Sequence, residues 1–163
     1  MKIFVREVTS ENWEEALALS VWPEQREFVP TVARSLAECH IRPDGKTYEP
    51  FAVYSGDEMV GFYTLSYNPA DATKCYLGGF LIDRAHQRRG LGRAALAEYL
   101  DGVARRFPSC AEVYLTVHSD NHAAEALYRG AGFEHLGFQV DGENAMRLRL
   151  TGARTGVQVR ADV

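Results

Sequence analysis

The chain has 163 residues, 46% of them hydrophobic, and a formal net charge of −4. This length favours one domain with a sizeable core, and the acidic balance argues against a general nucleic-acid-binding protein. No apolar run approaches the roughly 20 residues that span a bilayer, and the N-terminus lacks the apolar segment of a signal peptide, so we expect a cytoplasmic protein without a membrane partner. The three cysteines and five histidines are scattered, and we predict no metal site.

The first part of the chain predicts a strand, two helical segments and a hairpin. Residues 3–8 are β-branched and alternate weakly, which is typical of a strand. Thr9 or Ser10 is suited to cap a helix, and residues 24–40 predict a second helical region that is interrupted near Pro30. Residues 51–54 and 59–67 then predict two strands joined by a turn.

The second part predicts alternating strands and helices. Strands are expected over 75–83, 112–118, 134–140 and 144–150, a long helix over 91–107, and a short helix after Asn121. Gly78 and Gly79 inside a strand indicate a bulge or a close approach of backbones. The order β-α-α-β-β-β-α-β-α-β-β is an α/β pattern in a single domain over 1–150, and residues 151–163 are predicted to form a tail.

The most informative segment is Gln87-Arg88-Arg89-Gly90-Leu91-Gly92, which lies between an apolar strand and an Ala/Leu-rich helix. A strand, a glycine turn and a helix start in that order can bind a phosphate, because backbone N–H groups converge at the positive end of the helix dipole. Residues 71–110 hold 7 Lys/Arg against 4 Asp/Glu and form the only net-basic part of the chain. The hexapeptide alone is equally compatible with an ordinary helix start that carries surface arginines.

The run Gln-x-x-Gly-x-Gly after a strand ending in Leu-Ile-Asp resembles the pyrophosphate loop of the GNAT family of N-acetyltransferases. Residues 121–133, about thirty residues further on, resemble the second cofactor segment of that family. The resemblance covers nearly the whole chain. It implies the GNAT fold, in which a mixed, mostly antiparallel central sheet is flanked by helices, and an acyltransferase with acetyl-CoA as the acetyl donor.

The resemblance also implies roles for individual residues. The pyrophosphate would be held by the backbone N–H groups of Arg88, Arg89, Gly90, Leu91, Gly92 and Arg93. The pantetheine arm would bind along the main chain of Phe80, Leu81 and Ile82 like an added strand, which requires this strand to part from the strand at 112–118. Asn121 would bind the same arm, and Tyr128 would be the general acid that protonates the leaving thiolate after direct attack in a ternary complex.

The acceptor amine must lose a proton, because an alkylamine with a pKa near 10.4 is only about one part in a thousand neutral at pH 7.4. Some relatives carry a glutamate on the strand before the asparagine, but residues 115–118 read Leu-Thr-Val-His. This departure leaves the base open. His118 is a substitute or a structural histidine.

The N-terminal half points to the acceptor. Residues 21–29, 49–54 and 59–63 are similar to bacterial spermine/spermidine acetyltransferases of the Blt type, which implies a polyamine. Polyamines are bound by spaced carboxylates and aromatic faces, so we predict contacts with Glu24, Phe28 and Glu49. Glu24 is also suited simply to begin a helix after Pro23. A peptide or ribosomal-protein α-amine acetyltransferase and a non-catalytic acyl-CoA sensor remain alternatives, and exposed edge strands would allow a homodimer.

Overall fold

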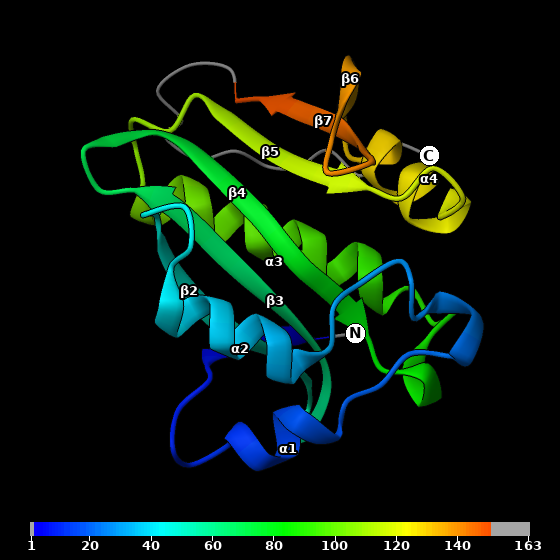
Figure 1. Ribbon diagram of the computed structural model, residues 1–163. Helices are drawn as coiled ribbons and strands as arrows, with labels where there is room; N and C mark the ends of the chain where they lie inside the picture. Colours follow the sequence, from blue (N-terminus) through cyan, green and yellow to red (C-terminus); the bar gives the residue numbers. More distant parts are fainter. Residues whose placement is uncertain (1, 151–163) are drawn as a thin grey trace.

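The described part of the chain is built on one mixed sheet of seven strands. The computed structural model describes residues 2–150, and its strands lie in the order β1-β2-β3-β4-β5-β7-β6 (Figure 1). The strands are β1 (Ile3–Glu7), β2 (Thr47–Ser55), β3 (Glu58–Asn68), β4 (Asp71–Ile82), β5 (Glu112–Val117), β6 (Glu134–Val140) and β7 (Glu143–Arg149). Among residues 2–150, only β4 and β5 pair in parallel, so the predicted mixed, mostly antiparallel sheet is confirmed.

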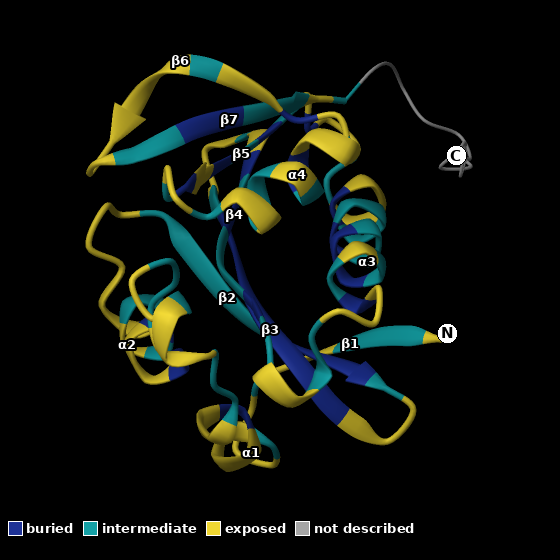
Figure 2. Cartoon of the chain, turned by 90° about the vertical axis from the view of Figure 1, so that its right-hand side faces the viewer, coloured by how far each residue is buried: buried dark blue, intermediate teal, exposed yellow. Residues whose placement is uncertain are grey.

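Helices cover both faces of the sheet. They are α1 (Trp13–Ala18), α2 (Val32–Ile41), α3 (Leu91–Arg106) and α4 (His122–Gly130), with short 3₁₀ turns η1 (Pro23–Gln25) and η2 (Arg84–His86). Figure 2 shows α3 on one side of the sheet and α1 and α2 on the other. Within residues 2–150, no helix has the length and apolar character needed to cross a membrane.

Two predicted helix boundaries were wrong. Thr9 and Ser10 do not cap α1, because the backbone N–H of Thr9 donates to the Asn12 side chain at 2.8 Å and the helix begins after Asn12. The helical region expected over 24–40 is interrupted near Pro30 as predicted, but its first part is only a three-residue turn, and α2 begins after Thr31 caps the backbone N–H of Arg34. Proline at position 30 disfavours helical geometry in the residue before it, which explains the break. The tail predicted over 151–163 lies outside the described residues.

The core consists of two apolar layers, one on each face of the sheet. The layer under α3 includes Tyr99 and Met146, and the layer under α1 and α2 includes Phe62. Strand β3 contributes to both layers and is buried along nearly its whole length, because it lies in the interior of the sheet. The sheet is therefore a rigid support on which the ends of β4 and β5 are held.

Candidate active site

The central feature of the site is an opening inside the sheet between β4 and β5. These strands pair through only three positions, Lys74 with Glu112, Cys75 with Val113 and Tyr76 with Tyr114. Beyond them β4 continues to pair with β3 as far as Ile82, but it has no partner on the β5 side. Residues 77–82 therefore present a free strand edge, and the predicted parting of the two strands is confirmed.

A β-bulge lies within this free edge. Thr64 pairs with Gly78 and Phe62 pairs with Leu81, so β4 contains one extra residue between the two pairs. Gly79 has a φ of +55°, a left-handed conformation that glycine adopts without a steric penalty. A Cβ at this position would lie 2.8 Å from the Ser35 hydroxyl oxygen on α2. The bulge predicted for the glycine pair is confirmed, whereas the close contact at Gly79 is with the Ser35 side chain and not with another backbone.

The glycine turn follows directly and has the backbone geometry of an anion site. Arg88 has a φ of +61° and Gly90 a φ of +77°, and α3 starts at Leu91 without a side-chain cap. The first N–H groups of α3 have no partner within a helix, and left-handed residues before them turn successive N–H groups toward one point. Arg88, Arg89 and Arg93 are exposed and form no ion pair within the described residues. The turn is therefore suited to a pyrophosphate.

The glycine turn is tied to the N-terminal loop by two glutamine side chains. The Gln87 amide nitrogen donates to Gln25 Oε1 at 2.9 Å and to the backbone oxygen of Ile82 at 3.0 Å. The Gln25 amide nitrogen donates back to Gln87 Oε1 at 3.1 Å. This pair joins η1, the end of β4 and the turn. Sequence reasoning missed it, although both residues lie inside segments that it singled out.

Tyr128 lies on α4 with its ring against the end of β4. Its ring centroid is 6.4 Å from that of Phe80 and 5.8 Å from that of Phe133, and the side chain is only 6% exposed. Its hydroxyl has no hydrogen-bond partner within residues 2–150. Burial, and then the negative charge of Glu143, raise the pKa of Tyr128 well above its ordinary value, so the phenol keeps its proton. The structure thus brings Tyr128 and Phe80 together at the opening.

Asn121 has a structural bond of its own. Its side-chain oxygen accepts the backbone N–H of Ala124 at 3.3 Å and caps α4, which fixes where Tyr128 is held. Within the described residues its amide nitrogen has no partner, so this group is free to donate to a ligand.

The predicted acceptor residues are not all brought together. The Phe28 ring lies 5.1 Å from the His118 ring, beside the end of β5, and Glu24 is exposed on η1. Glu49 lies elsewhere, because its carboxylate binds Arg106 at 2.6 and 3.0 Å and accepts the Tyr67 hydroxyl. Arg106 ends the 16-residue helix α3, about 24 Å from the glycine turn at its start. Glu49 therefore lies away from the opening and does not contribute to an acceptor site there.

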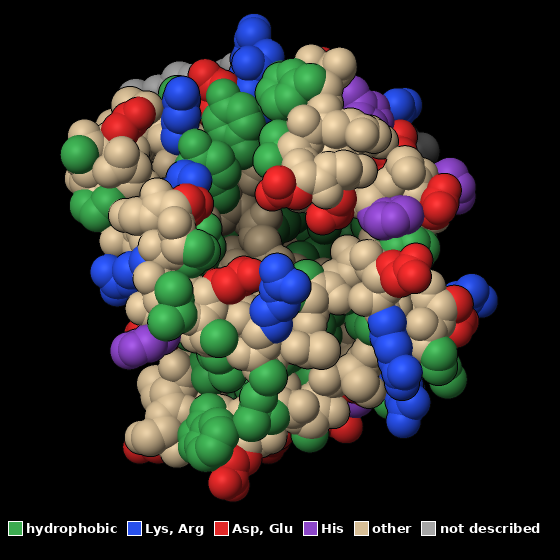
Figure 3. All heavy atoms as spheres, viewed as in Figure 1, with side chains coloured by type: hydrophobic (Ala, Val, Ile, Leu, Met, Phe, Trp, Pro, Cys, Tyr) green, Lys and Arg blue, Asp and Glu red, His purple; other side chains and the backbone are tan. Residues whose placement is uncertain are grey.

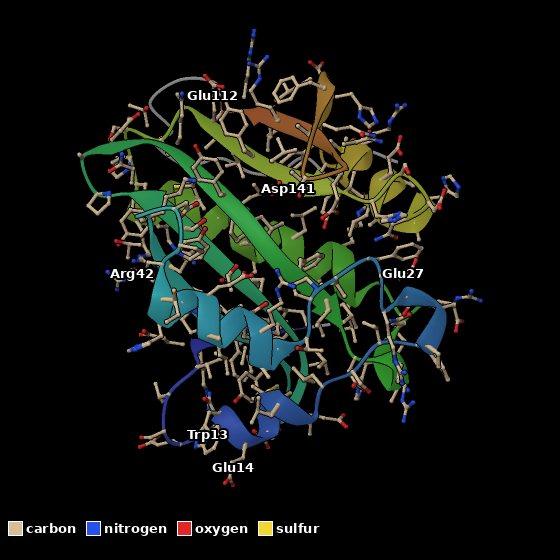
Figure 4. All side chains as sticks on the ribbon, viewed as in Figure 1. Trp13, Glu14, Glu27, Arg42, Glu112 and Asp141 are labelled. Carbon is tan, nitrogen blue, oxygen red and sulfur yellow. The ribbon has the colours of Figure 1, made fainter. Side chains whose placement is uncertain are left out.

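Other carboxylates surround the opening instead. Figure 3 shows a hollow in this face of the molecule, with acidic side chains above and below it. In Figure 4, Asp141 lies at the β6–β7 turn and Glu27 lies in the loop before α2. Glu143 follows at the start of β7 and is half-buried. Burial raises the pKa of its carboxyl group, and Asp141 adds to this, while His118 opposes it. Sequence reasoning did not group these three residues, because Glu27 lies far along the chain from Asp141 and Glu143.

The arrangement supplies what an acyl transfer requires. The turn can bind phosphates, the free edge of β4 can bind an amide-containing chain, and a protonated phenol lies beside that edge. On the other side, a hollow with acidic residues can receive a cation.

Comparisons with known proteins point the same way. A family model described as the Acetyltransferase (GNAT) family matches residues 5–133. The chain is 28% identical over 155 residues to a spermine/spermidine N(1)-acetyltransferase of Bacillus subtilis, covering 90% of this chain and 97% of that protein. It is 34% identical over 89 residues to the ribosomal protein bS18-alanine N-acetyltransferase of Escherichia coli, covering 55% and 57% of the two chains.

A solved structure shares the fold. The spermidine N-acetyltransferase from Vibrio cholerae, in complex with CoA and spermine, superposes with a TM-score of 0.69 and covers 90% of this chain and 95% of that one. The sequence identity is 18%, so this likeness concerns the fold.

Proposed function

The chain belongs to the GNAT family of acetyltransferases and is an acyltransferase, and we propose that it transfers an acetyl group from acetyl-CoA to a primary amine, with polyamines as favoured acceptors. The observation that carries the proposal is the opening between β4 and β5, which has a phenol on one side and an acid-rimmed hollow on the other.

In this proposal the donor binds along β4 and the start of α3. The pyrophosphate is held by the N–H groups of residues 88–93 and by the arginines among them. The pantetheine arm pairs with the main chain of Phe80, Leu81 and Ile82, where β4 has no partner on the β5 side. The Asn121 amide donates to the same arm. This arrangement directs the thioester into the opening beside Tyr128.

The transfer then requires stabilisation of the oxyanion and protonation of the thiolate. A backbone N–H near Ile82 binds the developing oxyanion, and one well-aligned donor of this kind contributes about 3 kcal/mol. Tyr128 donates its proton to the departing sulfur, because its hydroxyl is protonated and has no competing hydrogen-bond partner in the described part of the chain.

The acceptor proposal rests on charge and on a relative. Glu27 and Asp141 provide separated negative charges, Glu24 is exposed on the preceding turn η1, and Phe28 provides an aromatic face. The Bacillus subtilis relative that matches nearly the whole chain is named a spermine/spermidine acetyltransferase. The Escherichia coli relative, which matches over a shorter segment at higher identity, supports the alternative of a ribosomal-protein α-amine.

One assay separates the candidates. Thiol release from acetyl-CoA is measured with spermidine, spermine, small monoamines and N-terminal peptides as acceptors. We expect the highest kcat/KM with the polyamines. A preference for alanine-terminated peptides would favour the alternative acceptor, and acetyl-CoA binding without turnover of any amine would favour a sensor.

Tyrosine variants test the mechanism in the same assay. Tyr128→Phe should lower kcat about 100-fold without weakening acetyl-CoA binding, because it removes the proton donor. Tyr99→Phe is a matched control, since Tyr99 is also buried and its hydroxyl has no partner within the described residues, but it lies in the core under α3. Unchanged kcat in Tyr128→Phe at all pH values would exclude Tyr128 as the acid.

Glutamate variants test the acceptor contact. Glu24→Gln should raise KM for spermidine much more than KM for acetyl-CoA. Glu14→Gln, on α1 and distant from the hollow (Figure 4), removes the same charge and should change neither. Equal effects of the two substitutions would exclude a direct contact of Glu24 with the cation.

A further inference from the structure

Residues 115–118, at the end of β5 before Asn121, include no carboxylate, but the neighbouring strand brings one level with His118. In the β5–β7 ladder Thr116 pairs with Ala145 and Val117 with Asn144, so the next position sets Glu143 level with His118. Side chains alternate along β7, and Met146 is fully buried under α3, so Glu143 lies on the other face, which is the acceptor side.

The surroundings of Glu143 suit a group that exchanges protons. The side chain is half-buried and has no hydrogen bond or ion pair with another side chain within residues 2–150. The ionisable groups that act on it are His118 at the end of β5, Asp141 at the β6–β7 turn and Tyr128 on α4. Because burial raises its pKa, the carboxylate is a better proton acceptor than an exposed glutamate.

His118, the other candidate, is poorly suited to accept the proton. Its Nδ1 accepts the backbone N–H of Asp120 at 3.1 Å, so the neutral ring carries its hydrogen on Nε2. Both nitrogens are then engaged or protonated, and neither has a lone pair available to an amine. The Phe28 ring packs against the imidazole and holds it in place.

We infer that Glu143 is the general base of the proposed transfer and that His118, at the opposite position on β5, is a positioning residue beside that carboxylate. The inference rests on the proposed function. Glu143 takes one proton from the substrate ammonium, and the neutral nitrogen attacks the thioester carbon to form the C–N bond. The C–S bond then breaks, the thiolate takes the Tyr128 proton, and the proton shed by the new amide nitrogen restores the phenol. One proton is released to solvent from Glu143.

Base and acid are coupled in this scheme. The negative charge of Glu143 contributes to the raised pKa of Tyr128, after burial. When Glu143 accepts the ammonium proton, that charge disappears, and the phenol becomes a stronger acid just before it must donate. The two groups also approach from opposite faces of the sheet, Glu143 with the amine and Tyr128 with the leaving sulfur.

The test is the pH dependence of kcat/KM for spermidine in Glu143→Gln. We expect kcat/KM of this variant to fall at least about 100-fold near neutral pH and to rise with pH in proportion to the concentration of neutral amine. The Kd for acetyl-CoA, measured by calorimetry, should be unchanged, which reports an intact fold. Glu143→Asp keeps a carboxylate and should retain the acidic limb of the profile. His118→Gln should lose about tenfold and also retain that limb. Glu134→Gln removes an exposed charge from the same half of the sheet and should behave as the unsubstituted protein.

The outcomes are distinguishable. A Glu143→Gln variant with kcat/KM within about threefold of the unsubstituted protein and the same pH profile overturns the inference alone. Loss of the acidic limb in His118→Gln, with its retention in Glu143→Gln, overturns it in favour of His118. Absence of turnover by the unsubstituted protein, with acetyl-CoA bound, overturns the proposed function and this inference with it.

Discussion

The paired amides of Gln25 and Gln87 are expected to couple η1 to the glycine turn, and a double-mutant cycle measures that coupling. Each single substitution to alanine removes three hydrogen bonds, because Gln25 also accepts the backbone N–H of Trp22 and Gln87 also donates to the backbone oxygen of Ile82. The double substitution removes four distinct bonds. Two bonds are therefore shared between the singles.

The magnitude follows from those two shared bonds. A typical intramolecular hydrogen bond contributes about 0.5–1.5 kcal/mol net, so the coupling free energy should be about 1–3 kcal/mol. The methylene groups lost in each alanine variant add independently and cancel from the cycle. Each single variant should also bind acetyl-CoA more weakly, because Gln87 holds the turn against the end of β4.

Urea unfolding of the four proteins gives the stability cycle, and calorimetry with acetyl-CoA gives the binding cycle. Gln139→Ala is the control, since the Gln139 amide donates to Asn144 across the β6–β7 hairpin in an exposed position and should cost under about 0.5 kcal/mol. A Gln25–Gln87 coupling below about 0.5 kcal/mol in both cycles would refute the reasoning.

Two further predictions concern stability. Gly79→Ala should lower the free energy of unfolding by about 1–2 kcal/mol, because alanine is strained at a φ of +55° and its Cβ meets Ser35. The control Gly102→Ala, in the middle of α3, should raise the free energy of unfolding by up to about 1 kcal/mol. Equal effects of the two substitutions would contradict the bulge geometry. Glu49→Gln should destabilise by roughly 1–2 kcal/mol at neutral pH: burial alone would raise the pKa of Glu49, but the bonds from Arg106 and Tyr67 outweigh it and hold that pKa below 4.5. The stabilisation by Glu49 is present above the pKa that this carboxyl group has in the unfolded chain, and it is lost as the pH falls through its pKa in the folded protein. The unfolding curves of Glu49→Gln and of the unsubstituted protein should therefore converge in acid. A difference that persists in acid would contradict the ion pair as the source of the stabilisation.

The sequence predicted the fold, the bulge and the glycine turn because these features depend on local signals. Alternation and glycine position located the strands and the bulge at Gly79, and the spacing of Gln87 to Gly92 located the turn. The start of α1 was misplaced, since several residues before Trp13 are suited to cap a helix and tertiary packing decides among them.

The acceptor side was harder to predict, because it is assembled from distant segments. Glu49 was chosen for its charge, but its partner Arg106 lies 57 positions further along the chain, and no local sequence pattern predicts that ion pair. Glu143 reaches the site only through the register of β7 on β5, which the sequence of either strand alone does not specify.

The free edge of β4 also bears on how the protein behaves in concentrated solution. An unpaired strand edge is a template on which another chain can add, and proteins usually place such edges at the border of a sheet and protect them there. Here the edge lies in the interior of the sheet, between β4 and β5, and it must remain accessible for a ligand to bind. An occupying ligand would satisfy the same backbone groups that a foreign strand would seek. We therefore expect the ligand-free protein to be the more aggregation-prone form. The concentration of ligand would then govern the colloidal stability of the protein as well as its rate of turnover.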